Sequence, residues 1–119
     1  MLIVDDNLEV REVMAVIVGS LGYEVLTAGD AAEALELIRS HCGIDLLVSD
    51  LMMSGGVNGF ELAERARLLR SGLPVLLMSG YPAGSVEKSN FPILHKPYRR
   101  EQLALHIRAA LGDPVIVDV

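Results

Sequence analysis

The sequence predicts an α/β fold, a single domain in which five short strands alternate with helices and form a doubly wound parallel sheet. Short, continuously apolar runs such as 1–4 and 46–48 are typical of strands buried on both faces. Between these runs, apolar side chains recur at helical spacing, which indicates helices on both faces of the sheet. At 119 residues and 51% hydrophobic residues, the chain can bury such a core as one domain.

Local signals mark the individual elements. The predicted strands are residues 2–5, 23–27, 45–49, 74–78 and 93–95. The first helix is expected between Asn7 and Gly22, and the second between Asp30 and Gly43, where Asp30 and the glutamate three residues later form a capping box. Further helices are expected at 60–70 and 99–111, with only a short one around 85–89 in a Gly- and Pro-containing stretch.

Composition and charge exclude several classes of function. The formal net charge of −6 disfavours direct binding to nucleic acid or to an anionic membrane. The one cysteine, Cys42, cannot form an internal disulfide, and the apolar stretch 13–21 is too short to span a membrane. We therefore expect a cytoplasmic protein. The arginines of two predicted helices are expected on solvated faces: Arg65, Arg67, Arg70, Arg99 and Arg100.

Charged side chains follow three of the predicted strands. Asp5 and Asp6 end the first apolar run, Asp50 ends the third, and Lys96 ends the fifth. Because the carboxyl ends of parallel strands border the crevice in which open α/β sheets bind ligands, we expect these groups to converge there. Each of them alone has an ordinary explanation as a cap, turn or solvated loop residue. Their combination at one edge favours a functional site.

Three converging carboxylates repel one another unless a cation lies among them. Mg²⁺, which prefers oxygen ligands, is the natural choice, and Mn²⁺ could substitute. Lys96 can pair with a carboxylate and then with an added anionic group, and Ser79 adds a hydroxyl at the end of the fourth strand. These are the parts needed for phosphoryl transfer to a carboxylate, which predicts an aspartyl phosphate on Asp50.

With these residues assembled, the sequence resembles the receiver domain of two-component response regulators over residues 1 to about 111. The matching motifs are Asp5-Asp6, Asp50-Leu51-Met52-Met53, Met78-Ser79-Gly80 and Lys96-Pro97. The resemblance implies a flavodoxin-like (βα)5 fold with strand order 2-1-3-4-5. The domain is then residues 1–111, with the first strand truncated at its start, followed by a tail at 112–119.

The resemblance also implies a role for each site residue. Asp6 and Asp50 would bind Mg²⁺ directly, Asp5 would act mainly through water, and the backbone carbonyl of Met52 would complete the protein ligands. Phosphate would come from the phosphohistidine of a histidine kinase or a histidine phosphotransfer protein.

Ser79 and Lys96 would hold the phosphoryl group on Asp50, and the domain would then change conformation. It would catalyse only its own phosphorylation and dephosphorylation, as a monomer or weak dimer, and would not be an enzyme in isolation.

The sequence departs from the family pattern in three places. The loop after the third strand carries Ser54-Gly55-Gly56 where the family usually has a proline and a shorter turn. Ile93 occupies the position of the aromatic switch residue that usually acts with Ser79, so we expect the loops to carry the change. The short segment between Ser79 and Lys96, with its Ser-Gly-Tyr opening, is similar to the C-terminal receivers of hybrid histidine kinases.

Other functions remain as alternatives. An aspartyl-phosphate phosphatase would need a second acid two residues after its nucleophile, where Met52 stands. A flavin-binding module would need a phosphate loop where Asp5 and Asp6 would repel phosphate. A receiver-like interaction module that takes no phosphate gains little support from an intact set of site residues.

Overall fold

The computed structural model describes residues 1–53, 57–80 and 91–112. Within these ranges the chain forms β1 (Leu2–Val4), α1 (Leu8–Ser20), β2 (Leu26–Ala28), α2 (Ala31–Ser40), β3 (Leu47–Asp50), α3 (Gly59–Leu69), β4 (Val75–Ser79), β5 (Ile93–His95) and α4 (Arg100–Ala110). The short helix predicted around 85–89 lies outside the described residues. None of the helices in the described part is both long and apolar enough to cross a membrane.

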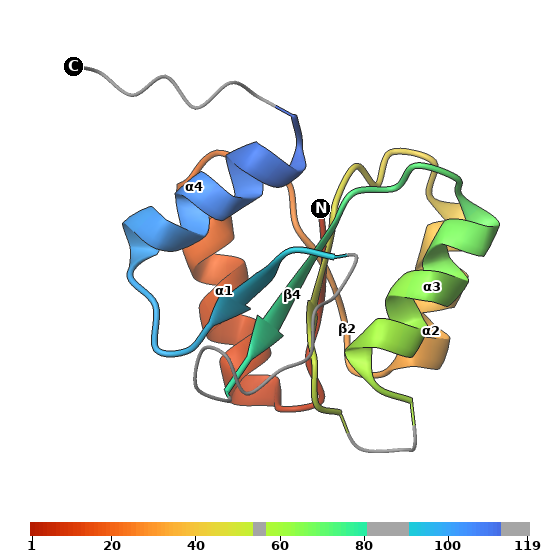
Figure 1. Ribbon diagram of the computed structural model, residues 1–119, viewed down its shortest axis with the longest axis horizontal. Coiled ribbons are helices and arrows are strands. Elements are labelled where there is room, and N and C mark those ends of the chain that lie inside the picture. Colours follow the sequence, from red (N-terminus) through yellow and green to blue (C-terminus); the bar gives the residue numbers. More distant parts are fainter. Residues whose placement is uncertain (54–56, 81–90, 113–119) are drawn as a thin grey trace.

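The five strands form one sheet in the order β2-β1-β3-β4-β5, and every neighbouring pair is parallel. In Figure 1, α1 and α4 lie on one side of the sheet and α2 and α3 on the other. This arrangement confirms the predicted doubly wound sheet and its strand order. It also places β1 beside β3, with the carboxyl ends of both strands at one edge.

The core has two apolar layers, one on each face of the sheet. Leu47 and Leu77 belong to the layer under α2 and α3, whereas their neighbours Val48 and Leu76 belong to the layer under α1 and α4. All four side chains are at most 1% exposed. Because successive strand residues point to opposite faces, burial of both faces explains why these strands read as continuous apolar runs.

Capping residues determine where α1, α2 and α3 begin. The side chains of Asn7, Asp30 and Asn58 accept hydrogen bonds from backbone N–H groups in the first turns of these helices. The first two caps are as predicted. The third is one residue earlier than expected, because Asn58 accepts from the N–H of Glu61 at 2.9 Å and so starts α3 at Gly59 instead of Phe60.

The predicted second strand, 23–27, is wrong at its start, since β2 begins at Leu26. Leu2 pairs with Leu26, the first residue of β2. Two residues earlier, the carbonyl of Glu24 accepts a hydrogen bond from the α-ammonium group of Met1, at 3.0 Å.

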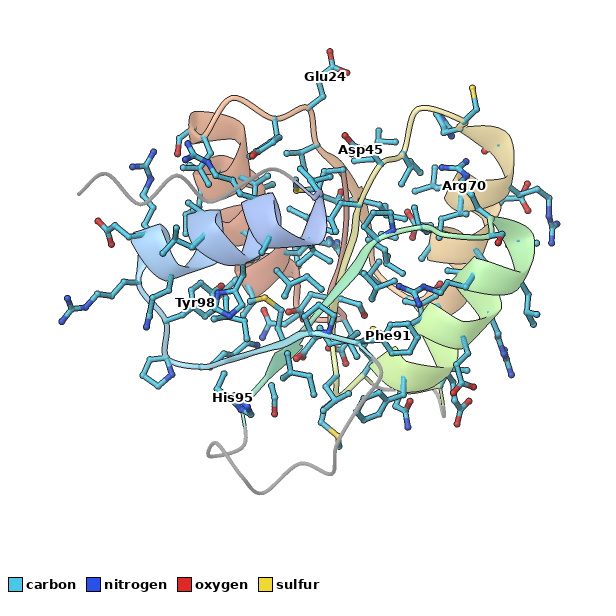
Figure 2. All side chains as sticks on the ribbon, turned by 45° about the horizontal axis from the view of Figure 1, so that its top comes forward. Glu24, Asp45, Arg70, Phe91, His95 and Tyr98 are labelled. Carbon is cyan, nitrogen blue, oxygen red and sulfur yellow. The ribbon has the colours of Figure 1, made fainter. Side chains whose placement is uncertain are left out.

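Arg70, which follows α3, caps the C-terminal end of α2 with its side chain. Its guanidinium donates hydrogen bonds to the carbonyls of Ile38 and His41, both at 2.8 Å, and to the carbonyl of Ile44. These carbonyls lie at and just beyond the last turn of α2, where a helix leaves acceptors without an internal partner. α2 therefore stops at Ser40, before the predicted end at Gly43. Figure 2 shows Arg70 between the ends of α2 and α3. The expectation of a solvated Arg70 is wrong.

We expect Arg70→Ala to lower the free energy of unfolding by about 2 kcal/mol, because buried or half-buried carbonyls lose a charged donor. Urea denaturation measures the change. Arg65 is exposed in α3, the helix that Arg70 directly follows, and supplies the control: Arg65→Ala should change stability by less than about 0.5 kcal/mol. Equal effects of the two substitutions would show that the bonds of Arg70 contribute nothing specific.

Candidate functional site

Three carboxylates meet at the carboxyl-end edge of the sheet. Asp5 and Asp6 follow β1 directly, and Asp50 is the last residue of β3. Since Val4 pairs with Ser49, Asp5 lies opposite Asp50. One carboxylate oxygen from each of the three acids lies within 4.8 Å of the others. Among the described residues, no other trio of His, Cys, Asp or Glu gathers in this way. The predicted convergence of the acids is confirmed.

Asp5 is the most buried of these acids, at 5% exposure. Its Oδ1 accepts a hydrogen bond from the backbone N–H of Asn7 at 2.9 Å, which fixes the carboxylate. Burial raises the pKa of Asp5 above its ordinary value, and the charges of Asp50 and Asp6 raise it further, against the opposing effects of the Asn7 N–H and of Lys96. The folded chain alone therefore disfavours the fully charged form of this cluster.

Lys96 lies just after β5 and faces the acids. Its Nζ is 3.5 Å from Oδ1 of Asp50, and the two side chains are 31% and 16% exposed. Its backbone N–H donates to the carbonyl of Ser79 at 2.7 Å, which holds the ends of β4 and β5 together. Ser79 itself is fully buried. The sheet thus brings together the lysine, the hydroxyl residue and the acceptor aspartate that the sequence singled out.

The two remaining predicted positions differ in setting. Met52, two residues after Asp50, has a 55% exposed side chain. Ile93 is partly buried in β5 and packs on the apolar layer under α2 and α3. Neither position adds a charged or hydroxyl group to the acidic edge.

An aromatic ring near the site comes from Tyr98. Its ring packs with the layer under α1 and α4, and its hydroxyl contacts Sδ of Met14 at 2.6 Å. Burial raises the pKa of Tyr98, and the negative charges of Asp5 and Asp50 raise it further. The Tyr98 side chain is therefore close enough to Asp5 and Asp50 for their charges to raise its pKa. Figure 2 shows Tyr98 beside α4.

Gly59 is a determinant of the site that sequence reasoning missed. A Cβ at this position would lie 2.6 Å from the carbonyl oxygen of Asp50 and 2.9 Å from Cα of Leu51. Its N–H donates to the carbonyl of Leu51 at 2.9 Å. Any side chain here would push the backbone that carries Asp50, so the start of α3 can lie against the end of β3 only with glycine. In the sequence, Gly59 is indistinguishable from the other glycines of its loop.

In the absence of metal, Asp5→Asn should increase the free energy of unfolding at pH 7. Asparagine keeps an acceptor for Asn7 but removes a buried charge beside Asp50. Because folding raises the pKa of Asp5, the stability associated with its protonated form is present below 3.8 and lost as the pH rises through the raised pKa. The gain from Asp5→Asn should therefore grow over that range.

Urea denaturation between pH 3 and pH 7 with a chelator measures this gain. Asp45→Asn is the matched control, since Asp45 is an exposed acid that lies 3.5 Å from the α-ammonium group of Met1. This control should give no gain. A gain from Asp5→Asn that is as large at pH 3 as at pH 7 would contradict the electrostatic explanation.

Comparison with known proteins agrees with this geometry. The model of the response regulator receiver domain family matches residues 1–108. Sensor histidine kinase RcsC of Escherichia coli (strain K12) is 39% identical over 119 residues, which cover 99% of this chain and 11% of RcsC. The DNA-binding transcriptional regulator NtrC of Bradyrhizobium sp. (strain RP501 Parasponia) is 30% identical over 118 residues, which cover 95% of this chain and 24% of NtrC. The chain thus spans only a small part of these relatives.

Solved receiver structures share the fold. The receiver domain of the hybrid histidine kinase CckA superposes with a TM-score of 0.78 at 37% identity, covering 92% of this chain and 96% of that one. The receiver domain of NtrX from Brucella abortus gives a TM-score of 0.82 at 28% identity, covering 95% and 98%. By its family match, its parallel sheet and its acidic edge, this chain belongs to the response regulator receiver domains, the phosphoryl-accepting modules of two-component signalling systems.

Proposed function

We propose that Asp50 is the phospho-acceptor of this receiver domain and that phosphorylation depends on a divalent cation. One observation carries the proposal: three carboxylates share an edge of the sheet within 4.8 Å, with Nζ of Lys96 3.5 Å from Oδ1 of Asp50. Among the three acids, Asp50 lies at the end of the central strand and is neither exposed like Asp6 nor buried like Asp5. Asp50 is thus accessible to a phosphate donor and has both negatively and positively charged neighbours.

The donor set fits Mg²⁺. Carboxylate and carbonyl oxygens are the ligands this hard cation prefers, and one carboxylate oxygen from each of Asp5, Asp6 and Asp50 lies within 4.8 Å of the others. Asp6 and Asp50 would bind the ion directly, Asp5 would act mainly through water, and the carbonyl of Met52 would complete the set. Mn²⁺ would serve in its place. When bound, the ion supplies positive charge against the negative charge of an incoming phosphoryl group.

The residues of the chain then perform the transfer. A carboxylate oxygen of Asp50 attacks phosphorus in line, forming the new O–P bond while the N–P bond to the donor histidine breaks. The ammonium group of Lys96 moves from its contact with Asp50 to one phosphoryl oxygen, and the hydroxyl of Ser79 donates to another. Both residues stabilise the charge on the phosphoryl oxygens, and neither takes a proton from the nucleophile.

The conformational response follows from the hydrogen bond that connects Lys96 and Ser79. Lys96 and Ser79 are joined by a backbone hydrogen bond, so a shift of either moves the ends of β4 and β5 together. The added negative charge would shift the population toward the arrangement in which both groups contact phosphate. Ile93 supplies no aromatic ring at the switch position, so the loops at this edge carry more of the change.

For the biological setting, we propose a receiver unit at residues 1–111, followed by the tail at 112–119. The phosphate donor is a histidine kinase or a histidine phosphotransfer protein in the cytoplasm, and the receiver acts as a monomer or weak dimer. It catalyses only its own phosphorylation and dephosphorylation. The family match and the receiver-bearing relatives support this setting. No observation favours a phosphatase, because the side chain of Met52 cannot act as the second acid.

Asp50→Asn should abolish phosphate incorporation from a small phosphodonor in the presence of Mg²⁺, since the amide is not a nucleophile for this transfer. Intact-protein mass spectrometry measures the added phosphate, and hydroxylamine should remove it from the wild-type chain. Asp45→Asn, a substitution of the same chemistry near the opposite end of the same strand, should incorporate phosphate at the wild-type level. Undiminished incorporation in Asp50→Asn would refute the assignment of the acceptor.

A further inference from the structure

Arg11 in α1 reaches back to the loop that carries the acid pair. Its Nη1 donates a hydrogen bond to the backbone carbonyl of Asp5 at 3.0 Å. The carboxylate of Asp5 is held separately by the N–H of Asn7, at 2.9 Å. Asp5 is therefore restrained at both its main chain and its side chain, and each restraint comes from the segment that follows β1.

Gly29 provides the space that Arg11 occupies. A Cβ at Gly29 would lie 2.7 Å from Nη1 of Arg11 and 3.7 Å from its Cζ, closer than real Cβ atoms come to another heavy atom in the first case. Gly29 is not among the glycines with positive φ, so its backbone conformation does not itself demand glycine. The requirement at this position is the space for the guanidinium group.

Arg11 contacts Asp5 at its main chain, through the hydrogen bond to the carbonyl at 3.0 Å. Because this carbonyl belongs to the backbone that carries the acid pair, displacing the guanidinium should change where the acid pair lies.

We propose that Arg11 is a positioning residue for the cation site, and that Gly29 is glycine because a side chain there would displace Arg11 from the carbonyl of Asp5. The inference rests on the proposed function, in which Asp5, Asp6 and Asp50 together take a divalent cation. Groups that orient metal ligands without touching the metal typically change affinity by about 10-fold or more when removed. Arg11 and Gly29 should each contribute an effect of that order through a single shared contact.

The test is the Mg²⁺ dissociation constant of the full chain, measured by isothermal titration calorimetry with the metal alone. Gly29→Ala is the main variant because it keeps every charge and moves only the flexible end of Arg11. We expect Gly29→Ala and Arg11→Ala each to weaken binding about 10-fold. The double variant should bind no more weakly than either single variant, since both remove the same contact. Arg11→Lys, which keeps a charged donor, should recover part of the loss.

Gly19→Ala is the matched control, because a Cβ at Gly19 in α1 would meet nothing within 4 Å. It should leave the dissociation constant unchanged. Urea denaturation of each variant separates positioning from a purely structural role, which would lower stability at unchanged Mg²⁺ affinity and would overturn the proposal. Additive losses in the double variant would overturn it as well. Should Arg11→Ala fail to fold, Gly29→Ala and Arg11→Lys still decide the question.

The outcomes also distinguish this inference from the proposed function. If the wild-type chain binds no Mg²⁺, the proposed function fails and the role of Arg11 falls with it. If the wild-type chain binds Mg²⁺ and Gly29→Ala binds it equally well, the cation site stands and the role of Arg11 and Gly29 is refuted.

Discussion

The ends of β1 and β3 lie side by side, and this proximity forces three carboxylates together within 4.8 Å. Like charges at such distances favour protonation or a counter-cation. Burial raises the pKa of Asp5 in the folded chain, and the charges of Asp50 and Asp6 raise it further. Lys96, which follows β5, offsets part of this repulsion through its ion pair with Asp50. The negative charge that Lys96 does not offset makes this edge a favourable site for a divalent cation. With the cation bound, the same edge would favour a phosphoryl group.

The restraints around this edge are mostly contacts to the main chain. The carbonyl of Asp5 accepts from Arg11, the carbonyl of Ser79 accepts from the N–H of Lys96, and Gly59 lets α3 lie against the backbone of Asp50. Such contacts place the acids without adding charge to the cluster. The carboxylate oxygens have contacts of their own: Oδ1 of Asp5 accepts from the N–H of Asn7, and Oδ1 of Asp50 lies 3.5 Å from Nζ of Lys96.

Much of the fold could be predicted because its signals are local. Strands buried on both faces have continuously apolar sequences, and Asn7 and Asp30 are N-cap residues that predict the helices following them. The convergence of Asp5, Asp6 and Asp50 followed from strand ends alone, because parallel strands deliver their last residues to one edge.

What the sequence could not show depends on neighbours distant along the chain. Arg70 donates hydrogen bonds to carbonyls in the last turn of α2 and just beyond it, which lie 26 to 32 residues away, and nothing near Arg70 in the sequence indicates them. A Cβ at Gly59 would meet the backbone of Asp50, and a Cβ at Gly29 would meet the end of the Arg11 side chain; both contacts exist only once the sheet has formed. The roles of all the site residues remain predictions: Asp5, Asp6, Asp50, Met52, Ser79, Ile93 and Lys96.

The most direct test of the central claim is a pH titration of the side-chain carboxyl carbons of Asp5, Asp6 and Asp50 by NMR, with and without Mg²⁺. Without metal, the carboxyl of Asp5 should titrate above its ordinary value of 3.8, because it is buried beside two other acids. With saturating Mg²⁺, its titration should move to lower pH, and the signals of all three carboxyls should shift together. Identical titration curves in the two samples would contradict the account, because the three acids would then share no cation.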